Sequence, residues 1–190
     1  MIKNIIFDVG GIIFDDSKSN IEKVLNKNCD LIYKTAYGKG FKDCLLGFKS
    51  VEEYIESLKG TEDFKDIKYI LSKENLQISY PLIKQNFEYI KTLKEKGYRI
   101  YLLTNITEDS YNYINNIIDI NSNFDGGIYS YQEKLIKPNL EIYELIISRF
   151  NLNRNETIFF DDKEKNVIAA QDAGIKSIVF KNIEDIKNNI

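Results

Sequence analysis

The chain has 190 residues, of which 43% are hydrophobic and 29% are charged, an ordinary composition for a globular protein. Its 26 basic and 29 acidic residues leave a net charge of -3, so we expect no basic surface that binds nucleic acid. The sequence has no histidine, which excludes catalytic triads, general bases and metal sites that depend on that residue.

The two cysteines and the N-terminus bear on where the protein works. Cys29 and Cys44 have neither a CxxC spacing nor a histidine partner, so we expect reduced thiols in a cytoplasmic protein, with no disulfide and no zinc site. Asp8 interrupts the apolar N-terminal stretch, which argues against a secretory signal. No apolar stretch approaches the roughly 20 residues that a membrane span needs, so we expect no membrane partner.

Short runs rich in Ile, Val, Phe and Tyr recur along the chain and predict buried strands. Helical patterns separate most of them, and this alternation is typical of a parallel sheet with helices on both faces. We therefore predict an α/β fold with a doubly wound, Rossmann-like parallel sheet. The predicted strands are 2–7, 99–103, 127–131, 157–160 and 177–180.

Three helices are predicted between these strands. One begins at Pro81 and stops at Gly97, a second follows the segment "KPN", and a third covers 163–173 before Gly174. Their apolar faces carry Ile83, Phe87, Ile90 and Leu93 in the first helix, and Tyr143, Ile146, Ile147 and Phe150 in the second.

Residues 16–80 show helical patterns and no strand pattern. Ser19 with Glu22, and Ser50 with Glu53, are spaced as capping boxes that begin two helices. We therefore divide the chain into an α/β core of residues 1–15 and 81–190 and an inserted, all-helical cap of residues 16–80. The apolar faces predicted in the cap are Ile21, Val24, Leu25, Leu31 and Ile32; Val51, Tyr54, Ile55 and Leu58; and Phe64, Ile67, Ile70 and Leu71.

Polar residues follow three of the predicted strands where each strand ends. Asp8 follows the first, Thr104 and Asn105 follow the second, and Asp161 and Asp162 follow the fourth. Ligands of open parallel sheets bind outside the carboxyl ends of the strands. The sequence therefore predicts that these side chains share one site.

Lys137 precedes Pro138, which biases the lysine toward an extended conformation before a helix. With carboxylates at Asp8 and Asp162 to hold Mg²⁺, Thr104, backbone amides and Lys137 could hold three phosphate oxygens. Asp8 could then attack phosphorus and form an aspartyl-phosphate.

Each of these residues also has a purely structural interpretation. Asp162 and Thr107 could cap the helices that follow them, and Lys137 could be a solvated surface residue. Asp15 and Asp16 are interpreted as linker residues before the helical insertion. We favour the functional interpretation because three polar strand ends and a Lys-Pro pair occur in order along the chain.

The sequence resembles the haloacid dehalogenase-like (HAD) hydrolase superfamily over nearly its whole length. "FDVGGII" resembles the first motif of that family, "LLTN" the second, "KPNLEIY" the third and "FFDDKEKNVIAAQDAGI" the fourth. The segment 16–80 resembles the family's helical (C1) cap, inserted after the first strand.

The resemblance implies a role for each matching residue. Asp8, Lys137 and Thr104 would be catalytic, with Asp8 the nucleophile. Thr104, Asn105, Lys137 and Gly11 would bind the substrate, and Asp8, the Gly10 carbonyl, Asp162 and Asp161 would hold Mg²⁺. Asn166, where an acid is often found, would orient a ligand or Lys137.

Gly10 departs from the family's phosphatases, which usually carry a second aspartate there as general acid and base. General acid–base catalysis contributes roughly 10²–10⁴-fold to a rate. We interpret the chain as a phosphatase of the branch that has glycine at this position. Two alternatives stay open: a catalytically weak protein that binds a phosphorylated ligand or a partner, and a dehalogenase that needs no metal.

The substrate predicted by this resemblance is a small phosphorylated metabolite, with sugar phosphates among the candidates. Specificity would lie in the cap, where Tyr33, Tyr37, Lys39, Tyr54 or Lys49 could face the site, although most of the tyrosines are expected to pack in the core. The oligomeric state is left open. The group that replaces the missing acid is left open too, with Asp15, Asp16 and the cap residues as the places to look for another proton donor.

Overall fold

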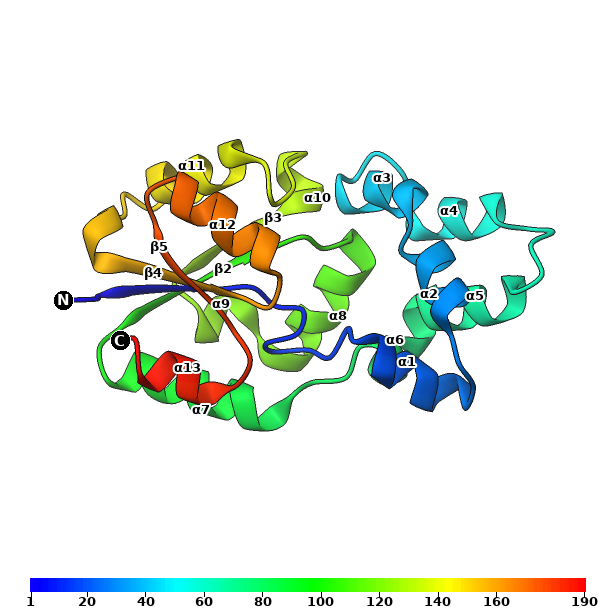
Figure 1. Cartoon of the computed structure of the whole chain (residues 1–190), viewed down its shortest axis with the longest axis horizontal. Coiled ribbons are helices and arrows are strands. Elements are labelled where there is room, and N and C mark those ends of the chain that lie inside the picture. Colours follow the sequence, from blue (N-terminus) through cyan, green and yellow to red (C-terminus); the bar gives the residue numbers. More distant parts are fainter.

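The computed structural model describes residues 1–190. A five-stranded parallel sheet in the order β3-β2-β1-β4-β5 forms the centre of the larger part of the molecule (Figure 1). Phe7 of the central strand lies in register with Leu102 of β2 and Phe160 of β4, so these strands end at one edge. The strands are β1 (Asn4–Phe7), β2 (Arg99–Thr104), β3 (Gly126–Tyr129), β4 (Thr157–Asp161) and β5 (Lys176–Val179).

Helices cover both faces of the sheet, which confirms the predicted α/β fold (Figure 1). Successive residues of a strand point to opposite faces, so Ile5 and Phe7 enter one buried apolar cluster and Ile6 enters the other. The first cluster includes side chains of α7 (Lys84–Glu95), α8 (Glu108–Ile118), α9 (Ile120–Asn123) and α13 (Ile183–Lys187). The second includes side chains of α11 (Leu140–Arg149) and α12 (Glu164–Asp172), and the short helices α10 (Ser130–Glu133) and η3 (Arg154–Glu156) complete the sheet region.

A separate group of helices lies beyond the carboxyl ends of the strands, on the right of Figure 1. These helices enclose their own cluster of 11 buried apolar residues. All of them fall within residues 16–80, and we propose this segment as a cap domain over the 1–15 and 81–190 core. They are α1 (Lys18–Leu25), α2 (Asp30–Ala36), η1 (Lys39–Phe41), α3 (Lys42–Leu45), α4 (Val51–Ser57), α5 (Phe64–Leu71), η2 (Lys73–Asn75) and α6 (Leu76–Ser79).

One of the two predicted capping boxes is confirmed and the other is wrong. At α4, the Ser50 amide donates to the Glu53 carboxylate (2.8 Å) and the Glu53 amide donates to Ser50 Oγ (3.1 Å). At α1, the N-cap is Ser17 instead of Ser19, and its hydroxyl accepts from the Asn20 amide. Both serines come before a stretch with the apolar spacing of a helix, so the sequence pattern alone could not show which of them is the N-cap.

Two helix boundaries differ from the prediction for identifiable reasons. The first cap helix ends at Asn26 in a left-handed conformation (φ 53°) and a new helix starts at Asp30, so Leu31 leaves the predicted apolar face and is 64% exposed. The helix expected from Pro81 starts at Lys84, because the Pro81 carbonyl accepts from the Asp15 amide and Leu82 forms a β-bridge with Phe14.

The strand predicted over 127–131 is also shorter at its end. It stops at Tyr129, and Ser130 begins α10. The Ser130 hydroxyl accepts a hydrogen bond from the Ile106 amide (2.8 Å). This hydrogen bond holds the loop that follows β2 in place.

Both cysteines are buried free thiols. None of the helices is both long enough and apolar enough to cross a membrane.

Candidate active site

Asp8 stands where β1 ends, and only 4% of its surface is exposed. Its amide still donates to the Phe160 carbonyl of β4 (2.9 Å), which fixes its backbone at the sheet edge. Its Oδ1 atom accepts from the Val9 amide (2.7 Å) and lies 2.9 Å from Lys137 Nζ. These contacts fix the orientation of the carboxylate through Oδ1, and neither of them uses Oδ2.

Gly11 makes the tight turn behind Asp8 possible. Its φ is +71°, a left-handed conformation that disfavours any side chain, and a Cβ there would approach the Asp162 carboxyl to 2.7 Å. The Gly11 amide donates to the Phe14 carbonyl (2.8 Å). Because this amide is used within the turn, Gly11 serves the site by leaving room for Asp162 and not as a free donor to a substrate.

Lys137 is buried between two carboxylates and is not a surface lysine. Its side chain has no exposed area, and Nζ lies 2.6 Å from Asp161 Oδ2 as well as 2.9 Å from Asp8 Oδ1. Asn105 fixes its backbone, because Asn105 Oδ1 accepts from the Lys137 amide (2.8 Å) and Nδ2 donates to its carbonyl (3.0 Å). Asn105 therefore positions Lys137, a contact that the motif alone did not indicate.

Asp161 and Asp162 have different surroundings although they are neighbours. The carboxylate of Asp161 is fully buried and accepts from Lys137, from Asn166 Nδ2 (2.9 and 3.0 Å) and from the Lys163 amide (2.8 Å). Asp162 Oδ1 is buried and has no hydrogen-bond partner.

Asp162 does not cap α12, whose N-cap is Lys163. Thr107 does cap α8 through the Ser110 amide, and Thr104, 1% exposed, ends β2.

The three acids could together hold a metal ion. One carboxylate oxygen from each of Asp8, Asp161 and Asp162 lies within 4.8 Å of the others. Asp162 Oδ1 is buried and accepts no hydrogen bond, and Lys163 Nζ approaches it only to 3.8 Å, so a closer cation would offset the cost of burying this oxygen. Hard carboxylate oxygens suit Mg²⁺, so this donor set fits the metal expected from the motifs.

The charges of the site are unbalanced without such a cation. Burial raises the pKa of Asp8 to about 7, although Lys137 beside it acts in the opposite direction. Burial would also raise the pKa of Asp161, but Lys137 and the Asn166 amide outweigh it and hold that pKa below its usual range. Burial raises the pKa of Asp162. Lys137 therefore stabilises the Asp161 carboxylate, whereas Lys137 and Lys163 together do not offset the effect of burial on the pKa of Asp8 or Asp162.

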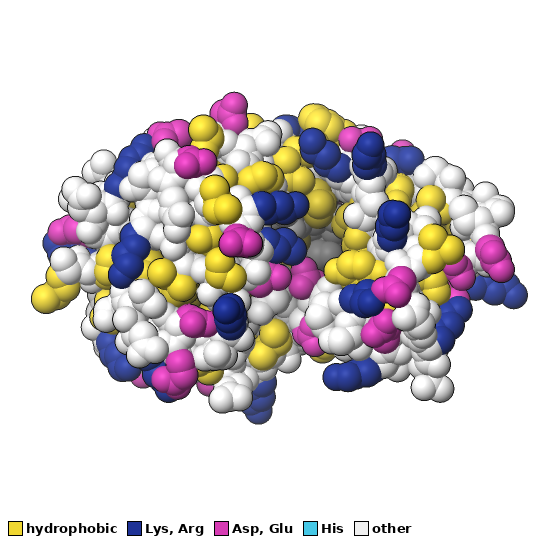
Figure 2. Space-filling model, in the orientation of Figure 1, with side chains coloured by type: hydrophobic (Ala, Val, Ile, Leu, Met, Phe, Trp, Pro, Cys, Tyr) yellow, Lys and Arg dark blue, Asp and Glu magenta, His cyan; other side chains and the backbone are white.

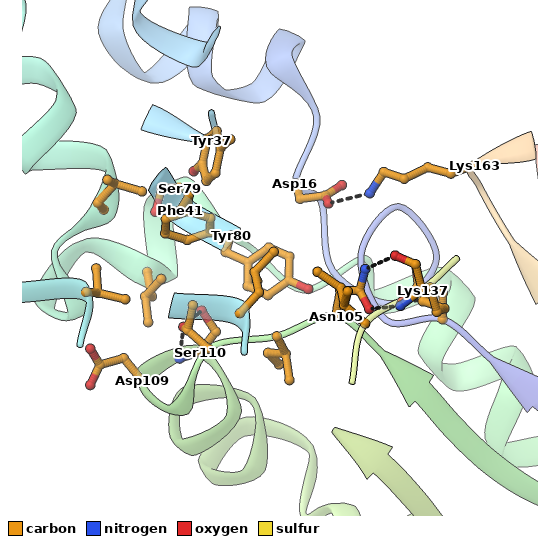
Figure 3. A pocket seen from close by; sticks show the side chains of 18 of the residues that line it. Asp16, Tyr37, Phe41, Ser79, Tyr80, Asn105, Asp109, Ser110, Lys137 and Lys163 are labelled. Carbon is orange, nitrogen blue, oxygen red and sulfur yellow. Dashed lines mark hydrogen bonds and ion pairs between the residues drawn. The ribbon is translucent and has the colours of Figure 1, made fainter. Parts of the chain in front are cut away.

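Asp16 is a site residue that the sequence reading placed in a linker. Its carboxylate reaches the space in front of Gly10, where a Cβ on that glycine would lie 2.6 Å from Asp16 Oδ2. Lys163 Nζ lies 3.5 Å from the same oxygen, and both side chains face the cavity in Figure 3. Asp15 instead turns back to accept from the Ser17 amide (2.9 Å).

A cavity of about 380 Å³ connects this edge of the sheet with the helices of 16–80. Figure 2 shows the hollow between the two parts of the molecule, with acidic and basic side chains at its sheet side. Of the cap side chains considered from the sequence, Tyr33 and Tyr37 line the cavity, whereas Lys39, Lys49 and Tyr54 do not. Tyr54 is 4% exposed and packs in the cap core, where its hydroxyl donates to the Thr35 carbonyl.

Comparisons with known proteins agree with this architecture. The chain is 25% identical over 184 residues to a phosphorylated carbohydrates phosphatase of Thermotoga maritima, covering 92% of this chain and 82% of that protein. It is 37% identical over 86 residues to a sesquiterpene phosphatase of Aspergillus oryzae, a match that spans 45% of this chain and only 44% of the fungal protein.

The fold matches that of a HAD family enzyme of Bacteroides thetaiotaomicron crystallised with magnesium and inorganic phosphate. The TM-score is 0.72, the identity is 22%, and 95% of each chain is covered. A family model for haloacid dehalogenase-like hydrolases matches residues 5–180. With four motifs at one sheet edge and a family match over most of its length, the chain belongs to the haloacid dehalogenase-like hydrolases.

Proposed function

We propose that the protein is a Mg²⁺-dependent phosphatase that hydrolyses a small phosphate monoester through an aspartyl-phosphate on Asp8. The observation that carries this proposal is the oriented Asp8 carboxylate beside buried Lys137, next to an acid pair in which Asp162 Oδ1 accepts no hydrogen bond. Relatives named as phosphatases of phosphorylated carbohydrates, of D-ribitol 5-phosphate and of sesquiterpenes support it. The first two align with 92% and 100% of this chain, and the third with 45%. Because those names span polar and apolar alcohols, they do not choose the substrate.

In the first step, Asp8 Oδ2 forms a bond to phosphorus while the bond from phosphorus to the leaving alcohol oxygen breaks. Val9 N–H and Lys137 hold Oδ1, so the carboxylate need not reorient to attack. Lys137 also places positive charge next to the transferring phosphoryl group. Bound Mg²⁺, held by Asp8, Asp161, Asp162 and the Gly10 carbonyl, would offset the charge of phosphate and carboxylates.

Asp16 is the group that we assign to the missing general acid. Its carboxyl lies where a side chain at position 10 would begin, so it takes over the place of the family's second aspartate. It gives its proton to the leaving alcohol oxygen. The resulting carboxylate then takes a proton from a water molecule, whose oxygen attacks phosphorus. The bond between Asp8 and phosphorus breaks, and inorganic phosphate leaves.

Phosphate release from p-nitrophenyl phosphate and acetyl phosphate tests this function. We expect turnover with Mg²⁺, none after chelation with EDTA, and restoration when Mg²⁺ is added back. Asp8→Asn should abolish turnover, whereas Asp43→Asn, the same change at an exposed cap position, should leave it unchanged. Full activity of Asp8→Asn, or halide release from 2-chloropropionate without metal, would contradict the proposal.

A further inference from the structure

We infer that the alcohol portion of the substrate is apolar, an alkyl, prenyl or aryl group, and not a sugar or another polyol. This inference rests on the proposed phosphatase function and names its substrate class. It is based on the side chains that line the cavity between the sheet edge and the helices of 16–80. It is also based on which polar groups in those walls already have hydrogen-bond partners.

The cavity has a charged end and an apolar body. Asp8, Lys137, Lys163 and Asp16 line the end at the sheet. From there aromatic and aliphatic side chains form most of the walls, together with Ser79, Thr107, Ser110 and Asp109. Its volume of about 380 Å³ is within the range of small-molecule sites, roughly 300–1,000 Å³. A phosphate at the charged end would direct its alcohol group into the apolar body.

Aromatic rings form one continuous wall of this cavity. The rings of Tyr33 and Tyr37 have centroids 4.8 Å apart, and those of Tyr37 and Phe41 are 5.3 Å apart. In Figure 3, Tyr37, Phe41 and Tyr80 lie between the charged end and the far side of the cavity. Flat aromatic surfaces gain contact energy from an apolar group without requiring hydrogen bonds from it.

Many of the hydroxyls in the walls already have partners within the protein. The Tyr33 hydroxyl donates to the Asp16 carbonyl (3.1 Å), and the Ser79 hydroxyl donates to the Asn75 carbonyl (3.3 Å). Thr107 and Ser110 are bonded to each other (3.0 Å) and cap α8. Four of the six hydroxyls in the walls are therefore already used, and those of Tyr37 and Tyr80 remain. A buried polyol with more hydroxyls than these can satisfy would leave some unpaired, which weakens binding.

The far side of the cavity carries an acid. Asp109 stands there, on the opposite side of the cavity from Lys137 and Asn105 (Figure 3). A second phosphate or carboxylate on the substrate would meet this negative charge. The site is thus suited to one phosphate joined to one apolar group.

Rates for primary alkyl phosphates and primary sugar phosphates test the inference, because their leaving groups are all primary alcohols. We expect kcat/KM to rise several-fold for each step from ethyl to butyl to hexyl phosphate. Hexyl phosphate should exceed glucose 6-phosphate and ribitol 5-phosphate by at least about tenfold. A flat chain-length series, or a higher kcat/KM for either sugar phosphate, would overturn the inference.

A matched pair of variants locates the effect. Tyr37→Ser removes an aromatic ring from the cavity wall, and we expect it to lower kcat/KM for hexyl phosphate several-fold more than for ethyl phosphate. Tyr69→Ser is the same change at an exposed position of α5 that does not line the cavity, and it should change neither value. An equal effect of Tyr37→Ser on both substrates would contradict an apolar subsite at this ring.

Direct binding separates failure of this inference from failure of the phosphatase proposal. Calorimetry with hexylphosphonate and 2,3-dihydroxypropylphosphonate, which cannot be hydrolysed, should show at least about tenfold tighter binding of the alkyl compound. If the protein releases phosphate from neither p-nitrophenyl phosphate nor acetyl phosphate, only the catalytic proposal falls, and this binding ratio still decides the inference. Tighter or equal binding of the dihydroxy compound would overturn it.

Discussion

The carboxylate of Asp16 occupies the space that a side chain on Gly10 would need. A Cβ at position 10 would lie 2.6 Å from Asp16 Oδ2 and 3.0 Å from Asp16 Cγ. The two positions are six residues apart, yet they share one volume of the site. A side chain on residue 10 would therefore require the Asp16 carboxylate to move from its present position.

Gly10→Ala should test the role of Asp16. Gly10 does not have a positive φ, so the backbone accepts alanine, but the methyl group must displace the Asp16 carboxylate. If Asp16 donates the proton, kcat/KM for alkyl phosphates should fall roughly 100-fold, the lower end of the contribution of general acid catalysis, because a displaced carboxylate retains part of its function. The rate with p-nitrophenyl phosphate should change little, because its leaving group needs little protonation. An unchanged rate for alkyl phosphates would argue against Asp16.

Asp16→Asn should give the same pattern more strongly. We expect a loss of roughly 10²–10⁴-fold for alkyl phosphates and a much smaller loss for p-nitrophenyl phosphate, measured as kcat/KM across leaving groups of increasing pKa, because kcat/KM reports the steps up to release of the alcohol and not the later attack of water. Asp15→Asn is the matched control, because its side chain turns away to the Ser17 amide. A uniform loss across all leaving groups would assign Asp16 to binding instead of proton transfer.

Lys137→Met should destabilise the metal-free protein. It removes the cation that lies 2.9 Å from Asp8 and 2.6 Å from Asp161 and leaves two buried carboxylates together. We expect a loss of about 3–5 kcal/mol in the free energy of unfolding, measured by urea denaturation in EDTA. Lys91→Met removes a surface pair with Glu88 and should cost about 0.5 kcal/mol or less. Equal losses in the two variants would contradict the bridging role of Lys137.

Asp8→Asn should stabilise the metal-free protein at alkaline pH. Burial raises the pKa of Asp8 to about 7 from its ordinary value of 3.8. The folded protein therefore binds more protons than the unfolded chain between these values, and stability falls as pH rises through that window. Asparagine removes this penalty, which is on the order of a few kcal/mol. The gain, measured by urea denaturation in EDTA, should be largest at pH 8 and vanish near pH 4. A gain independent of pH would contradict this origin.

The sheet was predictable from the sequence, and so was the meeting of Asp8, Lys137 and the Asp161–Asp162 pair at one of its edges. Asp8, Thr104 and Asp161 end or follow buried strands, and parallel strands bring their carboxyl ends to one edge whatever the loops do. The Ser50–Glu53 capping box was also predictable, because it depends only on four consecutive residues. Local pattern and strand direction suffice for such features.

Features set by loop geometry were not predictable. Asp16 reaches Gly10 only because the chain turns at Phe14, which bridges to Leu82, before the first cap helix begins. Asn105 reaches the Lys137 backbone across 32 positions of sequence. Leu31 is exposed because a left-handed Asn26 ends one helix early. Each depends on a backbone path that apolar periodicity does not encode.

The most direct test of the central claim is to trap the phosphoryl group on the protein. The enzyme is mixed with Mg²⁺ and acetyl phosphate, quenched in acid within the first turnover, digested and examined by mass spectrometry. The account predicts one phosphoryl group on the peptide that contains Asp8, and none on the same peptide of the Asp8→Asn variant. A phosphoryl group on another residue, or an active enzyme that never carries one on Asp8, would contradict it.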